Sequence, residues 1–309
     1  MEFSWTKKDL LSLYDLSREE ILFILNTAEE FKKVSQRNVK KVPALRGKTV
    51  VNLFVEPSTR TRVSFEVGVH ELGGNPLYLD QGKMQIGRGS ETVGDTAHVL
   101  SRYLHGIVIR TYAHAEVEEL AREANIPVIN ALTNEYHPCQ LLADLFTIYE
   151  YSGKLDRSVK VGFYGDGRSN IANSMILAAR LSGIDLVVCA PEEERPDEAL
   201  MAGAPNVRWE SDPKKAAKDL QYIYTDVWVS MGFEEEKARR MALFQPYQVN
   251  RAIFDLAAPD CKFLHCLPAH RGEEVTADVL DGKCSIVYDE AENRLHVQKA
   301  LMAKLIGKN

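Results

Sequence analysis

Short apolar runs alternate with helix-spaced segments along nearly the whole chain, and this alternation strongly limits the folds that it can adopt. Residues 49–55 and 106–110 are apolar and rich in β-branched side chains, whereas residues 92–103 repeat apolar side chains at helical spacing. Alternating strands and helices predict parallel sheets covered on both faces, with ligands bound beyond the carboxyl ends of the strands. We therefore predict an α/β protein with doubly wound parallel sheets.

The same alternation predicts two domains of similar size. In the first half we expect strands at residues 49–55, 77–79, 106–110 and 126–131. The pattern restarts at residue 160, where we expect strands at residues 160–165, 186–190, 222–226, 262–266 and 285–288. We assign residues 1–147 to a first domain, completed by a C-terminal helix within residues 290–309, and residues 148–289 to a second domain.

Charge and cysteine content narrow the class of protein. A net charge of −6 over 309 residues argues against a protein that holds nucleic acid by bulk positive charge. Five scattered cysteines, an odd number, suit reduced thiols better than a disulfide framework. The sequence shows neither a signal-peptide pattern nor an apolar stretch of membrane-spanning length. We expect a cytoplasmic protein that has neither a nucleic-acid nor a membrane partner.

Residues 56–66 predict a phosphate-binding turn between the first strand and a helix. Unpaired backbone N–H groups and the positive end of the helix dipole favour anions at such a turn. Hydroxyl and guanidinium side chains add donors there, from Ser58, Thr59, Arg60, Thr61 and Arg62. In the alternative interpretation Ser58 is only a helix cap and the arginines are solvated.

Further polar residues fall at the predicted carboxyl ends of strands. Arg110 ends the strand at residues 106–110, and His137 and Gln140 open the helix that follows the fourth strand, with Pro138 at its first position. Such positions carry the ligand sites of parallel sheets.

Four motifs together resemble the aspartate and ornithine carbamoyltransferases. Residues 58–62 look like the family's carbamoyl-phosphate signature, and residues 137–140, His-Pro-Cys-Gln, resemble its second signature in the cysteine form of ornithine enzymes. Residues 226–232 are similar to the ornithine-binding segment, and residues 265–268, His-Cys-Leu-Pro, to the ornithine-type catalytic loop. With residues 292–294 near the end, the resemblance spans nearly the whole chain.

The resemblance implies a set of site residues. Carbamoyl-phosphate ligands correspond to Ser58, Thr59, Arg60, Thr61, Arg62, Gln85, Arg110, His137, Gln140 and Arg294, with Cys266 and Leu267 lying where both substrates meet. Ornithine contacts correspond to Asn170, Asp226, Ser230 and Met231. The family also assembles as trimers in which a loop of one subunit completes a neighbour's site, and residues 81–89 match that loop.

The implied reaction is carbamoyl transfer from carbamoyl phosphate to the δ-amine of L-ornithine, which gives L-citrulline and phosphate through a tetrahedral intermediate without a cofactor. Guanidinium groups suit the phosphate dianion, and donors directed at the carbonyl oxygen suit the oxyanion. The residues to which we assign catalytic roles are Arg110, His137, Gln140, Asp226 and Cys266. Asp226 and Cys266 are candidates to orient the amine or to share its proton. The motifs leave the anabolic or catabolic direction open.

One departure from the ornithine pattern lies just before the first signature. Val55-Glu56 stands where ornithine enzymes usually have a lysine, and here the chain reads more like the aspartate branch.

Four alternatives remain open at this stage. Gly165-Asp-Gly167 suggests a dinucleotide-binding dehydrogenase, but Asn170 stands in place of the third glycine. A metal site from His265, Cys266 and His270 fits no common zinc spacing, and we expect no metal. The same fold also serves non-enzymatic binding proteins. Within the family, putrescine is the rival acceptor.

Overall fold

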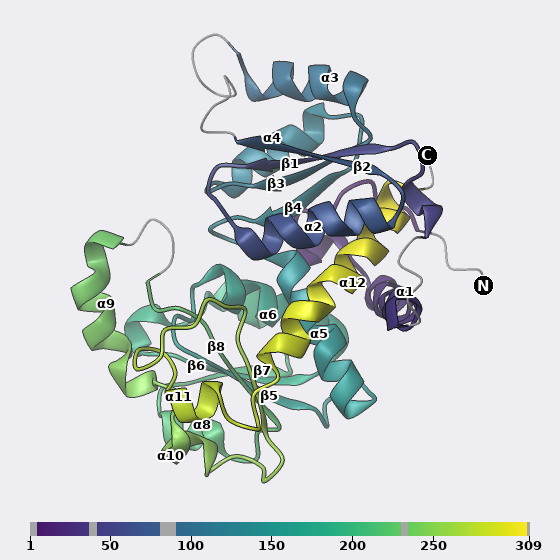
Figure 1. The fold of residues 1–309 in the computed structure, drawn as a ribbon. Coiled ribbons are helices and arrows are strands. Elements are labelled where there is room, and N and C mark those ends of the chain that lie inside the picture. The colour runs from purple at the N-terminus through teal and green to yellow at the C-terminus, as the bar shows by residue number, and fades with distance from the viewer. Residues whose placement is uncertain (1–4, 37–41, 81–90, 230–233, 308–309) are drawn as a thin grey trace. The chain divides into compact units, whose positions relative to one another are not determined.

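The chain forms two compact units in the computed structural model, which describes residues 5–36, 42–80, 91–229 and 234–307. The first unit contains residues 1–143 and 292–309, and the second contains residues 144–291 (Figure 1). Each unit is built around its own parallel sheet.

The sheet of the first unit has the strand order β2-β1-β3-β4, and its strands are β1 (Thr49–Phe54), β2 (Asn75–Asp80), β3 (Gly106–Arg110) and β4 (Val128–Leu132). All its pairings are parallel, with Val50 opposite both Pro76 and Gly106. The buried, β-branched runs that predicted β1 and β3 form the two central strands.

Helices cover both faces of this sheet: α1 (Arg18–Gln36), α2 (Thr59–Glu71), α3 (Val93–Tyr103), α4 (His114–Glu123), the first turns of α5 (Pro138–Ser152) and most of α12 (Val287–Leu305). One apolar core joins β1 and β3 to α3 and α4. On the other face lie α2 and α12 (Figure 1). Gly106 leaves room there for the side chain of Ile306, the residue directly after α12, because a Cβ at this position would clash with Ile306 Cδ1.

The sheet of the second unit has the order β7-β6-β5-β8-β9, and its strands are β5 (Lys160–Tyr164), β6 (Asp185–Cys189), β7 (Val207–Glu210), β8 (Tyr222–Thr225) and β9 (Lys262–Leu264). Its helices are α6 (Asn170–Ser182), α7 (Glu198–Ala202), α8 (Pro213–Ala217), α9 (Lys237–Phe244), α10 (Arg251–Phe254) and α11 (Ala277–Leu280). A second apolar core joins this sheet to α8, α10 and α11.

These features confirm the predicted fold class, including the return of the C-terminal helix to the first unit. A capping box begins α1: Ser17 Oγ accepts a hydrogen bond from Glu20 N, and Ser17 N donates to Glu20 Oε2 at 2.8 Å. Among the described ranges, no helix combines the length and the hydropathy that a membrane crossing needs.

The strand predicted at residues 285–288 is wrong. Ser285 pairs with Phe263 only through an isolated bridge, and α12 begins at Val287. Asp289 and Glu290 stand in the first turn of α12, where acidic side chains favour a helix. The apolar pair Ile286-Val287 is buried at the start of this helix.

Candidate active site

Several predicted site residues lie at the strand ends where the strand order of each sheet reverses. In the first unit β1 lies between β2 and β3, so the chain leaves β1 and β3 in opposite directions. In the second unit the same reversal occurs between β5 and β8. Parallel α/β sheets bind ligands at the carboxyl side of such switch points. The turn at residues 55–58 follows β1, Arg110 ends β3, and Asp226 directly follows β8.

The N-terminus of α2 is arranged as a set of donors. Ser58 is the residue before the helix, but its hydroxyl donates to Thr61 Oγ1 at 3.0 Å and makes no capping bond within the described chain. Thr61 Oγ1 also accepts from Arg294 Nη2 at 2.9 Å, which leaves its own O–H to donate. This geometry argues against the simple helix-cap interpretation and leaves backbone N–H groups at the helix start for an anion.

The positive charges of three guanidinium groups act on His137. Its pKa lies well below the usual 6.5, because burial disfavours the charged imidazole and the positive charges of Arg294, Arg110 and Arg60 add to that effect. These arginines come from α12, the end of β3 and the first turn of α2. The sheet and two helices thus bring together residues that are far apart in the sequence around a neutral imidazole.

Gln140 completes this group of residues from the first turn of α5. Its side chain is buried, as are those of His137, Thr61 and Arg294. Because α5 begins at Pro138, Gln140 lies in the same helical turn as His137, the residue directly before the helix. The first unit therefore holds a buried, positively charged site that suits a phosphate together with a carbonyl group.

Arg62 contacts Glu66 and Tyr78. Its Nε lies 2.9 Å from Glu66 Oε1, and its guanidinium stacks at 3.8 Å over the ring of Tyr78 on β2. Thr59 is exposed at the first position of α2. Of the two arginines of the signature, Arg60 acts on His137 through its charge, whereas Arg62 packs along the helix toward β2.

The unusual Glu56 is also accounted for within the first unit. Its Oε1 accepts a hydrogen bond of 2.6 Å from the hydroxyl of Tyr112, two residues beyond Arg110. Val55 N donates to Arg110 O at 2.9 Å, which ties the turn to the end of β3. The departure from the ornithine pattern is therefore a contact that joins the loops after β1 and β3.

In the second unit, Asp226 and Cys266 form a hydrogen-bonded pair. Cys266 Sγ donates to Asp226 Oδ1 at 3.1 Å, and Val227 N donates to the same oxygen at 2.8 Å. Burial, followed by the Asp226 charge, raises the pKa of the Cys266 thiol well above its usual value. Burial also raises the pKa of Asp226, while His265 and the bond from Cys266 oppose the shift. Cys266 is therefore a protonated donor and Asp226 is the acceptor.

A buried pair, His265 and Glu274, holds the Cys266 loop, and the sequence reading missed it. His265 Nδ1 accepts from Leu267 N at 2.8 Å, so its Nε2 carries the proton and faces Glu274 Oε1 at 3.2 Å. Both side chains are fully buried. Leu267 has φ +58°, which is uncommon for a residue with a side chain and marks a constrained loop. No local pattern in the sequence indicates that Glu274 is completely buried against His265.

One of the remaining candidates lies on α6. Asn170 is the first residue of α6, and Gln85, Ser230 and Met231 fall outside the described residues. Arg240, which the sequence reading also missed, bonds Trp228 O through Nε at 2.6 Å and pairs with Asp166. A buried arginine thus ties the loop after β5 to the segment after β8.

The dehydrogenase alternative finds little support at the loop after β5. Ser169 Oγ accepts from Ala172 N at 3.1 Å, so a side chain already caps α6 where a pyrophosphate would bind. The carboxylate of Asp166 is engaged by Arg240 and by Arg168 N. The structure also places His270 beside Glu273 and Glu274, whereas His265 and Cys266 group with Asp226.

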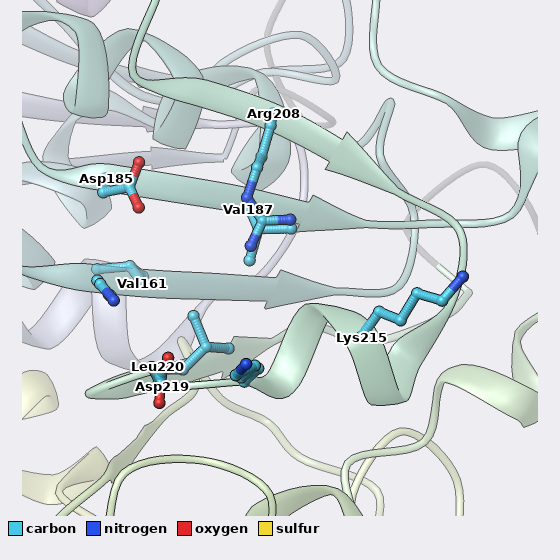
Figure 2. A pocket seen from close by; sticks show the side chains of 9 residues that line it. Val161, Asp185, Val187, Arg208, Lys215, Asp219 and Leu220 are labelled. Carbon is cyan, nitrogen blue, oxygen red and sulfur yellow. The ribbon is translucent and has the colours of Figure 1, made fainter.

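A cavity of about 250 Å³ in the second unit lies away from these residues. It is lined by Lys160, Val161, Asp185, Val187, Arg208, Lys215, Lys218, Asp219 and Leu220 (Figure 2). Lys160 and Asp185 are the first residues of β5 and β6. The first residues of two strands thus line the cavity, whereas parallel sheets bind substrates at the carboxyl ends of their strands.

Comparison with known proteins identifies both halves of the chain. Residues 8–150 match the family profile "Aspartate/ornithine carbamoyltransferase, carbamoyl-P binding domain", and residues 157–305 match "Aspartate/ornithine carbamoyltransferase, Asp/Orn binding domain". Ornithine carbamoyltransferase of Bacillus subtilis is 51% identical over 310 residues, which cover 97% of this chain and 94% of that protein.

Two further comparisons extend the likeness to an anabolic enzyme and to a solved structure. "Ornithine carbamoyltransferase, anabolic" of Pyrococcus furiosus is 50% identical, with 99% of each chain covered. The structure of ornithine carbamoyltransferase from Pyrococcus furiosus superposes with a TM-score of 0.94 at 48% identity, covering 99% of both chains.

Proposed function

This chain belongs to the aspartate/ornithine carbamoyltransferase family, and we infer that it transfers the carbamoyl group of carbamoyl phosphate to the δ-amine of L-ornithine, giving L-citrulline and phosphate. The observation that carries this function is the buried His137, whose pKa the positive charges of Arg294, Arg110 and Arg60 lower further. Such a group supplies charge for a phosphate and an uncharged N–H donor for a carbonyl oxygen.

Carbamoyl phosphate is proposed to bind at the N-terminus of α2. Its phosphate would take the helix N–H groups, the hydroxyl of Thr61 and the guanidinium of Arg60, and the hydroxyl of Ser58 would turn from Thr61 to the phosphate. Arg110, His137 and Gln140 would face the carbamoyl group, where charge grows on the oxygen as the amine attacks. Arg294 holds Thr61 and adds positive charge on the phosphate side.

Ornithine is proposed to bind in the second unit, with its δ-amine directed at Asp226. Both Asp226 hydrogen bonds within the described chain go to Oδ1, so Oδ2 remains for the amine. An alkyl amine is almost wholly protonated near neutral pH and must lose a proton before it attacks. A carboxylate orients the ammonium, and the Cys266 thiol fixes that carboxylate. Asn170, Ser230 and Met231 would hold the α-amino and α-carboxylate groups.

The acceptor is the first property to test. With carbamoyl phosphate saturating, we expect citrulline formation from ornithine at least about a hundredfold faster, by kcat/KM, than carbamoylation of putrescine or aspartate, because an acceptor that lacks matching polar groups leaves buried partners unpaired. Product formation is measured by chromatography for each amine. Equal turnover of putrescine would contradict ornithine as the acceptor while leaving the carbamoyl-phosphate half intact.

We also propose a homotrimer in the cytoplasm that serves arginine metabolism. Val63 and Val67 on α2 and Leu77 on the edge strand β2 expose apolar side chains on the first unit, with exposed fractions of 51%, 38% and 46%. Exposed apolar side chains beside an open sheet edge suit contact with a second copy of the chain. The anabolic name of one relative favours the biosynthetic direction.

Light scattering coupled to gel filtration tests the assembly. We expect three times the chain mass for the wild type and a smaller species for Val63→Glu/Val67→Glu, because buried carboxylates without partners oppose association. Tyr288→Glu is the matched control, since Tyr288 is 74% exposed in the second unit. A trimer that persists in the double variant places the interface elsewhere.

A further inference from the structure

The turn that follows the Cys266 loop carries a group of ligand-type side chains that the transfer reaction does not use. Gly272 has φ +91°, and Gly272 N donates to Val275 O at 2.8 Å while Glu273 N donates to His270 O at 3.0 Å. This tight turn gathers His270, Glu273 and Glu274. One ligand atom from each lies within 4.8 Å of the other two.

The carboxylate of Glu274 is only half satisfied. Its Oε1 faces His265 Nε2 and accepts from His270 N, but its buried Oε2 finds no hydrogen-bond donor among the residues that the structure describes. Burial by itself would raise the Glu274 pKa, yet the bonds from His265 and from the backbone lower it below the usual value. A buried, charged oxygen without a hydrogen-bond donor lowers the stability of the folded chain, and a bound cation would remove this cost.

We propose that His270, Glu273 and Glu274 bind a divalent transition-metal ion that accepts imidazole and carboxylate ligands together, such as Mn²⁺ or Zn²⁺. His270 Nδ1 lies 3.6 Å from Glu274 Oε2 and 3.9 Å from Glu273 Oε2. Ligands at about 2.1 Å from one ion are about 3 to 3.4 Å apart, so these two distances need to close by about 0.2 to 0.9 Å.

The two outer ligands are able to make that adjustment. The side chain of His270 is 50% exposed and that of Glu273 is 30% exposed, whereas Glu274 is fully buried. An ion therefore has a solvent path to the site, a fixed inner ligand and room for water molecules to complete its coordination. The alternative is that a proton on His270 alone offsets the charge of Glu274.

A metal at this position acts on the Cys266 loop through Glu274. The ion withdraws negative charge from the carboxylate, whose Oε1 holds His265 Nε2. His265 in turn fixes Leu267 through Nδ1. The ion therefore loosens or shifts the loop that carries Cys266, whichever acceptor the enzyme uses.

Titration of the purified chain with Mn²⁺ tests the site, with the paramagnetic resonance signal of free Mn²⁺ as the readout. Mn²⁺ prefers oxygen and nitrogen ligands to thiols, so it discriminates against the neighbouring Asp226, His265 and Cys266 group. We expect saturable binding of one ion at this site, and a loss of affinity of about tenfold or more in both His270→Ala and Glu273→Gln.

Two control variants separate this site from nonspecific binding. His98→Ala removes a surface histidine that faces Glu123 at 3.6 Å without a buried carboxylate, and Cys266→Ser disables the thiol group. Both should bind Mn²⁺ as the wild type does. Unsaturable binding, unchanged affinity in His270→Ala, or a loss confined to Cys266→Ser would each overturn the proposal. Equal thermal unfolding midpoints of the variants establish that they are folded.

Discussion

Replacing Asp226 with asparagine is expected to lower kcat/KM for ornithine by about a thousandfold, a loss typical of removing a positioned acid–base group. Asparagine keeps the size of the side chain and can still accept from Val227 N, so the local fold should survive. It removes the negative charge that attracts the ammonium form of the δ-amine. Initial rates over a range of ornithine concentrations measure the effect.

Two further variants test whether the loss in Asp226→Asn comes from the missing negative charge. Cys266→Ser keeps a donor toward Asp226 Oδ1 and should cost much less than Asp226→Asn. Asp219→Asn is a control that removes an exposed carboxylate of the same unit, and it should leave the rate unchanged. If Asp226→Asn retained more than about a tenth of the wild-type kcat/KM, the carboxylate would not orient the amine in the way proposed.

The site residues that could be predicted from the sequence are those that lie in contiguous motifs. Ser58 to Thr61 follow a recognisable strand and begin a helix, so local rules place their donors at a helix N-terminus. Arg110 follows from the rule that parallel strands present their carboxyl ends at one edge, whereas Asp226 follows only from the resemblance of residues 226–232 to the ornithine-binding segment. Those rules act over a few residues and need no knowledge of tertiary neighbours.

What the sequence could not predict depends on distant partners. Arg62 packs against Tyr78 on β2 and against Glu66. From the sequence alone, Arg60 and Arg62 cannot be told apart in this respect. Glu274 reads as an ordinary charged surface residue until the fold buries it against His265. β7 was missed because its Val-Arg-Trp-Glu run is polar at alternate positions and only partly buried at the sheet edge.

The start of α12 shows two local signals in conflict. Ile286-Val287 favour a strand by propensity, whereas Asp289 and Glu290 favour the first turn of a helix. The sheet already gains its edge from β9, and Ser285 makes only a bridge to it. Tertiary packing therefore favours the helix. This helix places Arg294 against Thr61 at the anion site of the first unit.

Replacing His137 with alanine is expected to lower kcat by about a hundred- to a thousandfold, the usual effect of removing one oxyanion donor. Inorganic phosphate lacks the carbonyl group, so its affinity should change much less, and calorimetry with phosphate measures this. His137→Gln should recover part of the rate because its amide also donates. His114→Gln, at another buried histidine of the first unit, is the control for a purely structural effect.

The charge state of His137 gives this prediction a pH test. Burial and the guanidinium groups of Arg294, Arg110 and Arg60 stabilise the neutral imidazole, so its pKa falls well below 6.5 and its titration lies on the acid side of that value. The ratio of wild-type to His137→Gln rates should therefore be equal at about pH 6.5 and about pH 8. A ratio that rises several-fold toward the lower pH would mean that protonated imidazolium, and not neutral imidazole, stabilises the oxyanion.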